Sequence, residues 1–133
     1  MTGADVVGEL LRGANALTAK VLAASIKAGR LPDGVALPAL LVRTVSVVDR
    51  QPLKRGPTRR RTDRVAVTVR AASYRDQVDV IRILRSVADG WLGSKVGAQS
   101  ATILLAGTGP DVAGPADTFE QTQDLRVSFD EPA

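Results

Sequence analysis

Residues 64–92, RVAVTVRAASYRDQVDVIRILRSVADGWL, decide the fold, because the hydrophobic period changes within them. Val65, Val67 and Val69 alternate with small or polar residues, which is typical of a strand with one buried face. Ser73 is a good helix N-cap, and after it the apolar residues recur at helical spacing. The sequence therefore predicts a strand followed directly by a helix. The apolar face expected for this helix comprises Val78, Ile81, Leu84, Val87, Ala88 and Trp91.

That helix is expected to run to about Leu92 and to end at Gly93. Before the strand, residues 4–28 carry apolar side chains at steps of three and four, which predicts one long helix. Residues 40–48 are β-branched and apolar on both faces, which is typical of a central strand. Alternating apolar residues also predict strands at 101–106 and 124–129.

The expected order is helix, strand, strand, helix, strand, strand. Because the strands come in adjacent pairs, we predict an α+β fold with a four-stranded antiparallel or mixed sheet and both helices packed on one face. One domain is expected over residues 1–133. Residues 49–63, rich in Pro, Gly and charge, are predicted to be a long, flexible, basic loop between the first two strands, and residues 130–133 a frayed end.

The composition excludes most catalytic chemistry. The 133 residues include no Cys and no His, which removes thiolate and imidazole nucleophiles, bases and zinc ligands. Residues 107–110 resemble a nucleotide loop, but no Lys-Ser/Thr follows and Pro110 lacks an amide hydrogen. Only two Phe, one Tyr and one Trp are present, too few for a base-stacking platform. We predict no catalytic residue, no metal site and no cofactor.

The start of the chain carries Asp5 and Glu9 where a secretory signal would carry basic residues. Its apolar runs are shorter than the roughly 18 residues that a membrane span needs. A soluble protein that is intracellular at synthesis and does not contact membranes is expected.

Charge is divided unevenly along the chain. Residues 50–64 carry seven basic groups and one acidic group, whereas residues 111–133 carry one basic group and six acidic ones. The basic candidates for a DNA-lining or partner-docking site are Arg50, Lys54, Arg55, Arg59, Arg60, Arg61 and Arg64. The acidic candidates for a subunit interface are Asp111, Asp117, Glu120 and Asp124.

The basic segment has three interpretations. It is a solvated loop with no further role, or it contacts phosphates, or it contacts the carboxylates of a protein partner. Six Arg and one Lys favour bidentate binding of phosphate or carboxylate. Without neighbouring aromatic residues, contacts with DNA would reach the backbone without reading bases. Basic and acidic segments on one chain also suit head-to-tail contact between identical subunits, which can close into a ring.

Several stretches together make the chain resemble the tail-completion or tail-terminator proteins of long-tailed phages over residues 4–130. These stretches are the leading helix, VALPALLV at 35–42, DRVAVTVR at 63–70, VDVIRILRSVA at 78–88 and QTQDLRVSF at 121–129. The resemblance implies a structural virion protein located in the tail or neck and assembled in the host cytoplasm. Six subunits would form a ring that caps the tail tube and joins it to the head connector, with genome DNA passing through.

Other functions remain open at this stage. The chain could form a neighbouring neck ring, the head–tail connector or stopper. It could also be a small basic module that binds nucleic acid without sequence preference, although its acidic C-terminal strand disfavours that function. A carboxylate-dependent enzyme is the least favoured alternative. The expected partners are further copies of the chain, the tail tube protein, the connector or stopper protein, and DNA.

Overall fold

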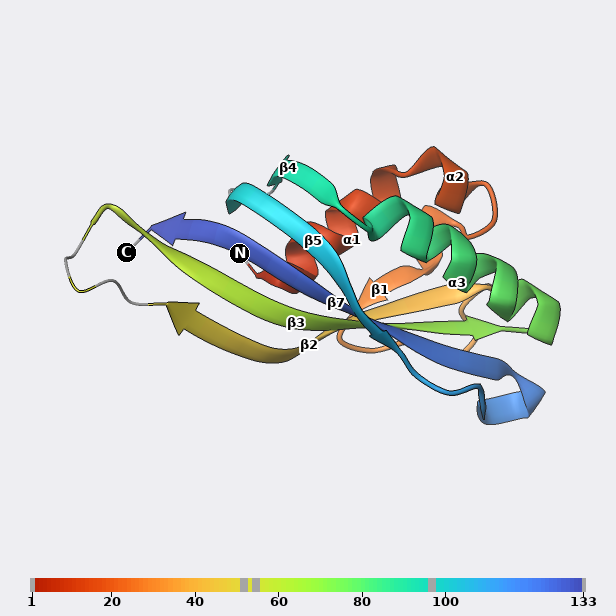
Figure 1. Ribbon diagram of the computed structural model, residues 1–133. Helices are drawn as coiled ribbons and strands as arrows, with labels where there is room; N and C mark the ends of the chain where they lie inside the picture. The colour runs from red at the N-terminus through yellow and green to blue at the C-terminus, as the bar shows by residue number, and fades with distance from the viewer. Residues whose placement is uncertain (1, 51–52, 54–55, 96–97, 133) are drawn as a thin grey trace.

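The computed structural model describes residues 2–50, 53, 56–95 and 98–132. It is elongated and has two layers, a mixed sheet and the helices α1 and α3 on one face of that sheet (Figure 1). The elements in chain order are α1 (Gly3–Gly13), α2 (Asn15–Thr18), the short 3-10 helix η1 (Ala23–Ser25), β1 (Ile26–Ala28), β2 (Ala39–Arg50), β3 (Thr58–Ala71), α3 (Tyr74–Ala88), β4 (Trp91–Lys95), β5 (Ala98–Thr108), β6 (Val112–Ala113), the 3-10 helix η2 (Pro115–Asp117) and β7 (Phe119–Pro132).

The strands lie in the order β1-β2-β3-β7-β5-β4, and β6 pairs with the start of β7. β1 runs parallel to β2, and the other pairings are antiparallel. The α+β class and the mixed sheet are thus as predicted, but the strand number is wrong. The four predicted strands correspond to β2, β3, β5 and β7, whereas β1, β4 and β6 were missed. These three strands span three, five and two residues, too few to show a clear period of two.

The prediction of one helix over residues 4–28 is wrong beyond Gly13. Thr2 starts α1 with a reciprocal capping box, in which its side chain accepts from the Asp5 amide and the Asp5 carboxylate accepts from the Thr2 amide. The segment then breaks into α2, η1 and β1. Leu17 and Val21 are nevertheless buried, so their spacing identified core positions although not a continuous helix.

The second helix begins as predicted. The Ser73 hydroxyl accepts a hydrogen bond of 3.1 Å from the Asp76 amide, and Asp76 lies in the first turn, where the helix dipole favours an acid. The helix ends at Ala88 rather than near Leu92. Gly90, with φ of +73°, turns the chain into β4 in place of the predicted Gly93.

The apolar face of α3 differs from the prediction at one turn. Val78 is 42% exposed, whereas Gln77 and Val80 are buried. Ile81, Leu84 and Ala88 are buried as expected, and they pack with residues of α1 against one face of the sheet. The large buried core side chains include Leu11, Leu17, Leu40, Leu84, Ile103, Leu125 and Phe129.

The predicted flexible loop over residues 49–63 is largely strand. β2 continues to Arg50 and β3 begins at Thr58, and the two pair in register as far as Arg50 opposite Arg60. β7 pairs with β3 to its other end, Thr58 opposite Pro132, so residues 130–132 are not frayed; Ala133 lies outside the described residues. Figure 1 shows these strands extending together beyond the region that the helices cover.

β2 is central for only a short distance. β1 pairs with Leu40, Leu41 and Val42. From Arg43 to Arg50 every side chain is exposed, and β3 is the single pairing partner in the part of the chain that the structure describes. The prediction of a strand with both faces partly buried is therefore wrong for two thirds of β2, because the apolar residues of this half lie on a protruding edge.

Candidate partner and nucleic-acid interface

Alternation along β3 divides the basic run between two faces of the sheet. Arg59 and Arg61 lie on the face that carries the helices, in line with the buried Val65. Arg60 and Arg64 lie on the opposite face, which no helix covers (Figure 1). Hereafter the uncovered side is called the open face. The sequence candidates therefore do not form one cluster.

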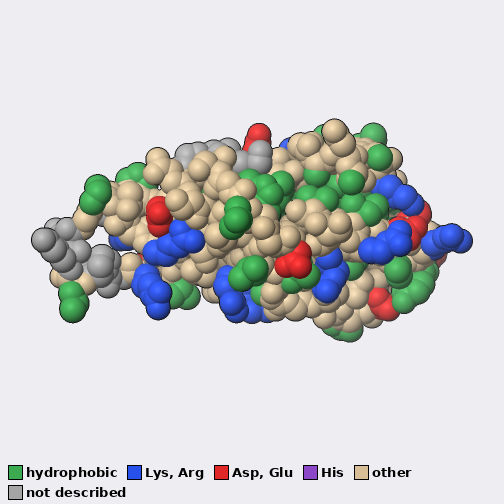
Figure 2. All heavy atoms as spheres, turned by 45° about the horizontal axis from the view of Figure 1, so that its top comes forward, with side chains coloured by type: hydrophobic (Ala, Val, Ile, Leu, Met, Phe, Trp, Pro, Cys, Tyr) green, Lys and Arg blue, Asp and Glu red, His purple; other side chains and the backbone are tan. Residues whose placement is uncertain are grey.

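Two further basic candidates cannot be placed, since Lys54 and Arg55 lie outside the described residues. Arg50 ends β2 directly opposite Arg60, and thus on the open face. Figure 2 shows one side of the molecule, on which Lys and Arg side chains are spread along its length with Asp and Glu among them. The sequence predicted that these charges lie together in one loop. In the structure, most of the described ones lie on strands β2 and β3 and are spread along them.

On the helix side, Arg61 is held by a buried carboxylate. Its Nε and Nη2 donate to Asp63 Oδ1 and Oδ2 at 2.7 and 2.9 Å, and its guanidinium lies over the Phe129 ring, 5.4 Å from the centroid. The hydrogen bond from Arg61 to Asp63 raises the pKa of Arg61, against burial, which lowers it. This arrangement keeps the guanidinium ionised and in a fixed position.

Glu131 joins the same cluster from β7. Arg59 Nε donates to it at 3.0 Å, and Arg61 Nη1 donates at 3.3 Å. Burial alone would raise the pKa of Glu131, but the hydrogen bonds from the two arginines outweigh it and hold the pKa below its ordinary value. Arg59 and Arg61 are thus bound within the subunit and are poor candidates for contacting a partner.

On the open face, β3 and β7 form a ladder of polar pairs. Arginines of β3 pair with acids of β7, and hydroxyl pairs lie between them. The pairs are Arg60–Asp130 at 3.2 Å, Thr62–Ser128 at 3.0 Å, Arg64–Asp124 at 2.7 Å, Thr68–Thr122 at 2.9 Å and Arg70–Glu120 at 2.8 Å. The acidic and basic segments of the sequence therefore meet inside one chain.

This ladder changes the meaning of the acidic candidates. Asp124 and Glu120 neutralise Arg64 and Arg70. Asp111 accepts from the Tyr74 hydroxyl at 2.9 Å and from Gln77 Nε2 at 2.7 Å, and the hydrogen bond from Tyr74 to Asp111 raises the pKa of Tyr74. Asp117, in η2, is the candidate that remains exposed without a partner in the described part of the chain. Charge complementarity between subunits consequently cannot rest on Asp124 or Glu120.

Three arginines of the open face have no acidic partner among the described residues: Arg43 and Arg50 on β2, and Arg126 on β7. Arg126 stands directly opposite Arg64, whose side chain is 43% exposed. The open face therefore keeps a surplus of exposed guanidinium groups. Such groups can bind phosphate or carboxylate oxygens without reading bases. Arg43 and Arg126 were not among the sequence candidates, because they lie outside the basic run.

The loop at residues 107–111 is fixed by the side-chain amides of glutamines, of which Gln123 is buried and Gln121 half-buried. Gln123 and Gln121 donate to the carbonyl oxygens of Gly107 and Gly109 at 3.0 and 2.9 Å. Gln77 reaches the same loop through Asp111. The loop thus offers its carbonyl oxygens to the protein interior, an arrangement that joins α3 to β7 and differs from a phosphate cradle, which presents amide hydrogens.

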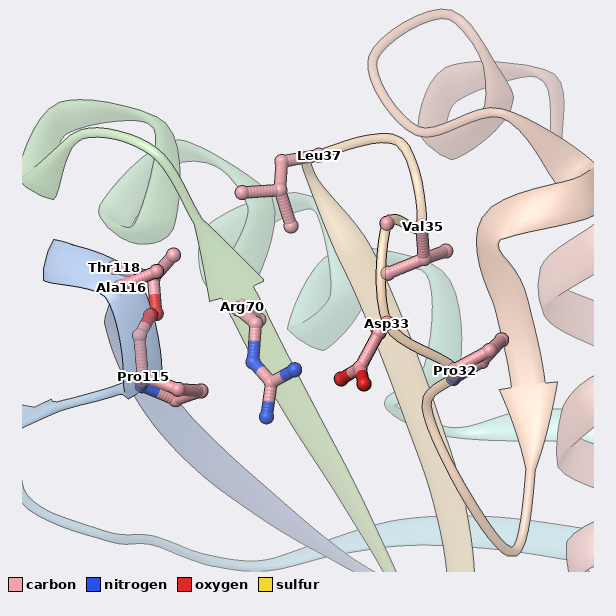
Figure 3. Close-up of a pocket in the computed structure, with 9 residues that line it drawn as sticks. Pro32, Asp33, Val35, Leu37, Arg70, Pro115, Ala116 and Thr118 are labelled. Atoms are coloured by element: carbon pink, nitrogen blue, oxygen red, sulfur yellow. The ribbon is translucent and has the colours of Figure 1, made fainter.

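A pocket of about 230 Å³ lies where β3 ends, between the turn at Pro32–Val35 and η2. Arg70 projects into it, with Asp33 and Pro115 on either side (Figure 3). Its other walls are mostly apolar, and its arginine is already paired with Glu120 at 2.8 Å. The pocket does not bring together a nucleophile and a base.

Within the described residues, no group of three acidic side chains is placed to hold a metal ion. No helix in the same part of the chain is long and apolar enough to cross a membrane.

Neither a protein-family model nor a curated protein sequence matches this chain. The fold, however, is similar to that of a solved structure described as the virion of a native gene transfer agent particle. The TM-score is 0.65 at 15% sequence identity, and the alignment covers 94% of this chain and 92% of the other. The two chains therefore share a fold over nearly their whole lengths, and the comparison shows the fold alone because so few residues are identical.

Proposed function

We propose that the chain is a structural subunit of a phage-like virion, and that its place is the tail terminator, a ring that caps the tail tube and joins it to the head connector. The observation that carries this proposal is the fold shared, end to end, with a chain from a gene transfer agent virion. The resemblance of the sequence to tail-terminator proteins supports the finer assignment.

The architecture supports an assembly role. The ends of β2, β3 and β7 extend past the helices as an arm. In the described structure the outer side of β2 has no pairing strand from Arg43 to Arg50, so this part of β2 is a free edge. Exposed strand edges are sites where another chain can add. We further propose that the chain is not an enzyme, since its sequence contains no Cys and no His, and the arginine of the pocket, Arg70, is already paired with Glu120.

The open face has two candidate partners, DNA and another protein of the particle. If this face lines the channel of a ring, Arg43 and Arg126 would meet phosphates without sequence readout. If it faces the tube or the connector, the same groups would bind carboxylates. A neighbouring neck ring is the second candidate function, supported by the same fold. A free-standing nucleic-acid-binding module is less favoured, because β7 neutralises much of the basic charge of β3.

Removal of the chain from the cells that produce the particles separates these functions. A terminator limits tube growth and completes the joint, so its loss should yield unjoined heads together with tubes of irregular length in electron micrographs. Loss of a connector ring should prevent joining while tail length stays uniform. Normal particles with tails of normal length would overturn both assignments.

A further inference from the structure

We propose that the arm of one copy of the chain seats on the opposite end of the next copy, through β2 on one side and the start of α3 and β7 on the other. The arm is defined as residues 43–50, 58–64 and 126–132, and the end face as Tyr74, Val78 and Phe119 with the turns around them. This inference rests on the proposed ring function and assigns the two surfaces that would form the ring.

The first observation is the free edge of the arm. Val45, Val47 and Val48 are 55%, 44% and 63% exposed. Proteins usually protect such an edge with charge, proline or a bulge. Here the edge carries Arg43, Asp49 and Arg50, and a bulge between Thr44 and Ser46 interrupts the ladder. Val45 in the bulge and Val47 and Val48 after it nevertheless remain uncovered. A long exposed edge with three apolar side chains is a surface that suits burial against another chain.

The second observation lies at the other end of the molecule. Tyr74 and Phe119 are 50% and 37% exposed, and their rings meet edge to face with centroids 6.2 Å apart. Val78, one turn along α3 from Tyr74, is 42% exposed. The whole sequence has only four aromatic residues, so half of them lie in this one patch. Exposed aromatic pairs beside aliphatic side chains are typical of the centres of protein interfaces.

The third observation is charge. The arm carries seven Arg and four Asp or Glu, a net charge of +3, which becomes +2 when Asp124, the partner of Arg64, is counted with it. The end of the molecule, taken as residues 29–38, 70–79 and 107–122, carries three Arg and six Asp or Glu, a net charge of −3, which becomes −1 when Lys20 and Arg82, the partners of Asp79, are counted with it. The two ends therefore attract each other, and two like ends repel. The two regions keep opposite signs after these ion pairs are counted.

These observations select a second copy as the occupant. The apolar basic arm and the apolar acidic end lie at opposite ends of the molecule (Figure 1), so one chain cannot join them within itself. Contact between two different surfaces is heterologous, and repeated copies then close into a ring or continue as a filament. A closed ring leaves no arm and no end face unoccupied.

Cysteine cross-linking tests this contact, because the chain has no cysteine of its own. The variant carries Val48→Cys on the arm and Val78→Cys on the end face, both at exposed positions. Its matched control carries Leu92→Cys with Val78→Cys, since Leu92 is 71% exposed on β4, at the other edge of the sheet. A short bismaleimide is added to purified protein at high concentration and to isolated particles, and denaturing gels are read.

We expect a ladder of dimers and higher multiples from the Val48→Cys, Val78→Cys variant, at least five times the yield of the control, and a lower yield at high salt. A protein that carries Val48→Cys alone or Val78→Cys alone should give no cross-linked product larger than the dimer. If the variant is present in particles but links no better than the control, the assigned contact is wrong while the virion function stands. If the chain is absent from particles, the proposed function fails, and the cross-links of the purified protein alone decide whether the contact exists.

Discussion

The buried carboxylate of Asp63 accepts a hydrogen bond of 2.7 Å from the amide of Gly3, sixty residues away, and so fastens the first turn of α1 to the middle of β3. The side chain of Asp63 is fully buried and also accepts two hydrogen bonds from Arg61. A carboxylate at the N-terminus of a helix interacts favourably with the helix dipole. One side chain thus joins the helix layer to the base of the arm.

Asp63→Ala should destabilise the fold by about 3 kcal/mol, because it leaves the Arg61 guanidinium and the Gly3 amide without their main partner in a buried setting. The measurement is chemical denaturation followed by circular dichroism. Asp49→Ala is the matched control, since Asp49 stands opposite Arg61 in the β2–β3 ladder but is exposed. Equal stabilities of the two variants would show that the buried contact contributes nothing.

Gly3→Ala should also destabilise the protein, by about 1–3 kcal/mol, because a β-carbon at residue 3 would lie 2.7 Å from the Asp63 β-carbon. Gly13→Ala is the control. It adds the same group to the same helix where no atom beyond the neighbouring residues and the helix's own backbone lies within 4 Å, and should be neutral or slightly stabilising. Thermal unfolding distinguishes the two; a Gly3→Ala protein as stable as the wild type would mean that α1 is not seated as closely as described.

Local patterns predicted the central elements well. The alternation of Val65, Val67 and Val69 and the cap at Ser73 depend on neighbours in sequence, and the structure confirms both. The short strands β1, β4 and β6 were missed because pairing with a longer neighbour forms them, and their own sequences carry no periodic signal.

The candidate site was harder to predict, because its chemistry depends on distant pairs. The sequence showed a basic segment and an acidic segment, which suggested contact between subunits. It could not show that Arg60 meets Asp130 and that Arg64 meets Asp124 within one chain, which requires the register of β3 against β7. The same pairing explains why the predicted basic loop is a strand. The strand register also identified Arg43 and Arg126 as exposed arginines of the open face without an acidic partner among the described residues.

Acid should weaken the arm through Glu131, which stands opposite Arg59 near the far end of the arm. The folded-state pKa of Glu131 lies below its ordinary value of 4.5, so its ionised form contributes stability that is fully present above that value and is lost as the pH falls through the folded-state pKa. The wild type should therefore lose more unfolding free energy than Glu131→Gln between about pH 5 and pH 3. Denaturation series across that range provide the measurement, with Glu9→Gln at an exposed position of α1 as the control. Parallel pH profiles for the wild type and Glu131→Gln would refute the role of this ion pair.

The surplus guanidinium groups of the open face should give weak binding to duplex DNA that ignores sequence and falls steeply with salt. Replacing Arg43 and Arg126 with Ser should reduce the slope of log K against log salt by about 2, since each lost phosphate contact removes roughly 0.9. Arg75→Ser with Arg82→Ser, both exposed on α3, is the control with the same charge. Fluorescence anisotropy with two unrelated duplexes measures all three proteins. An unchanged slope would assign the open face to a protein partner instead.

Cryo-electron microscopy of isolated particles tests the central claim most directly. The chain would carry a small tag at a loop position distant from both proposed contact surfaces, such as Asp89, which is exposed between α3 and β4. The account predicts one ring of tagged subunits at the junction of tail tube and head connector, with DNA density able to pass through its centre. Tagged density along the tube, on the capsid surface, or absent from intact particles would contradict it.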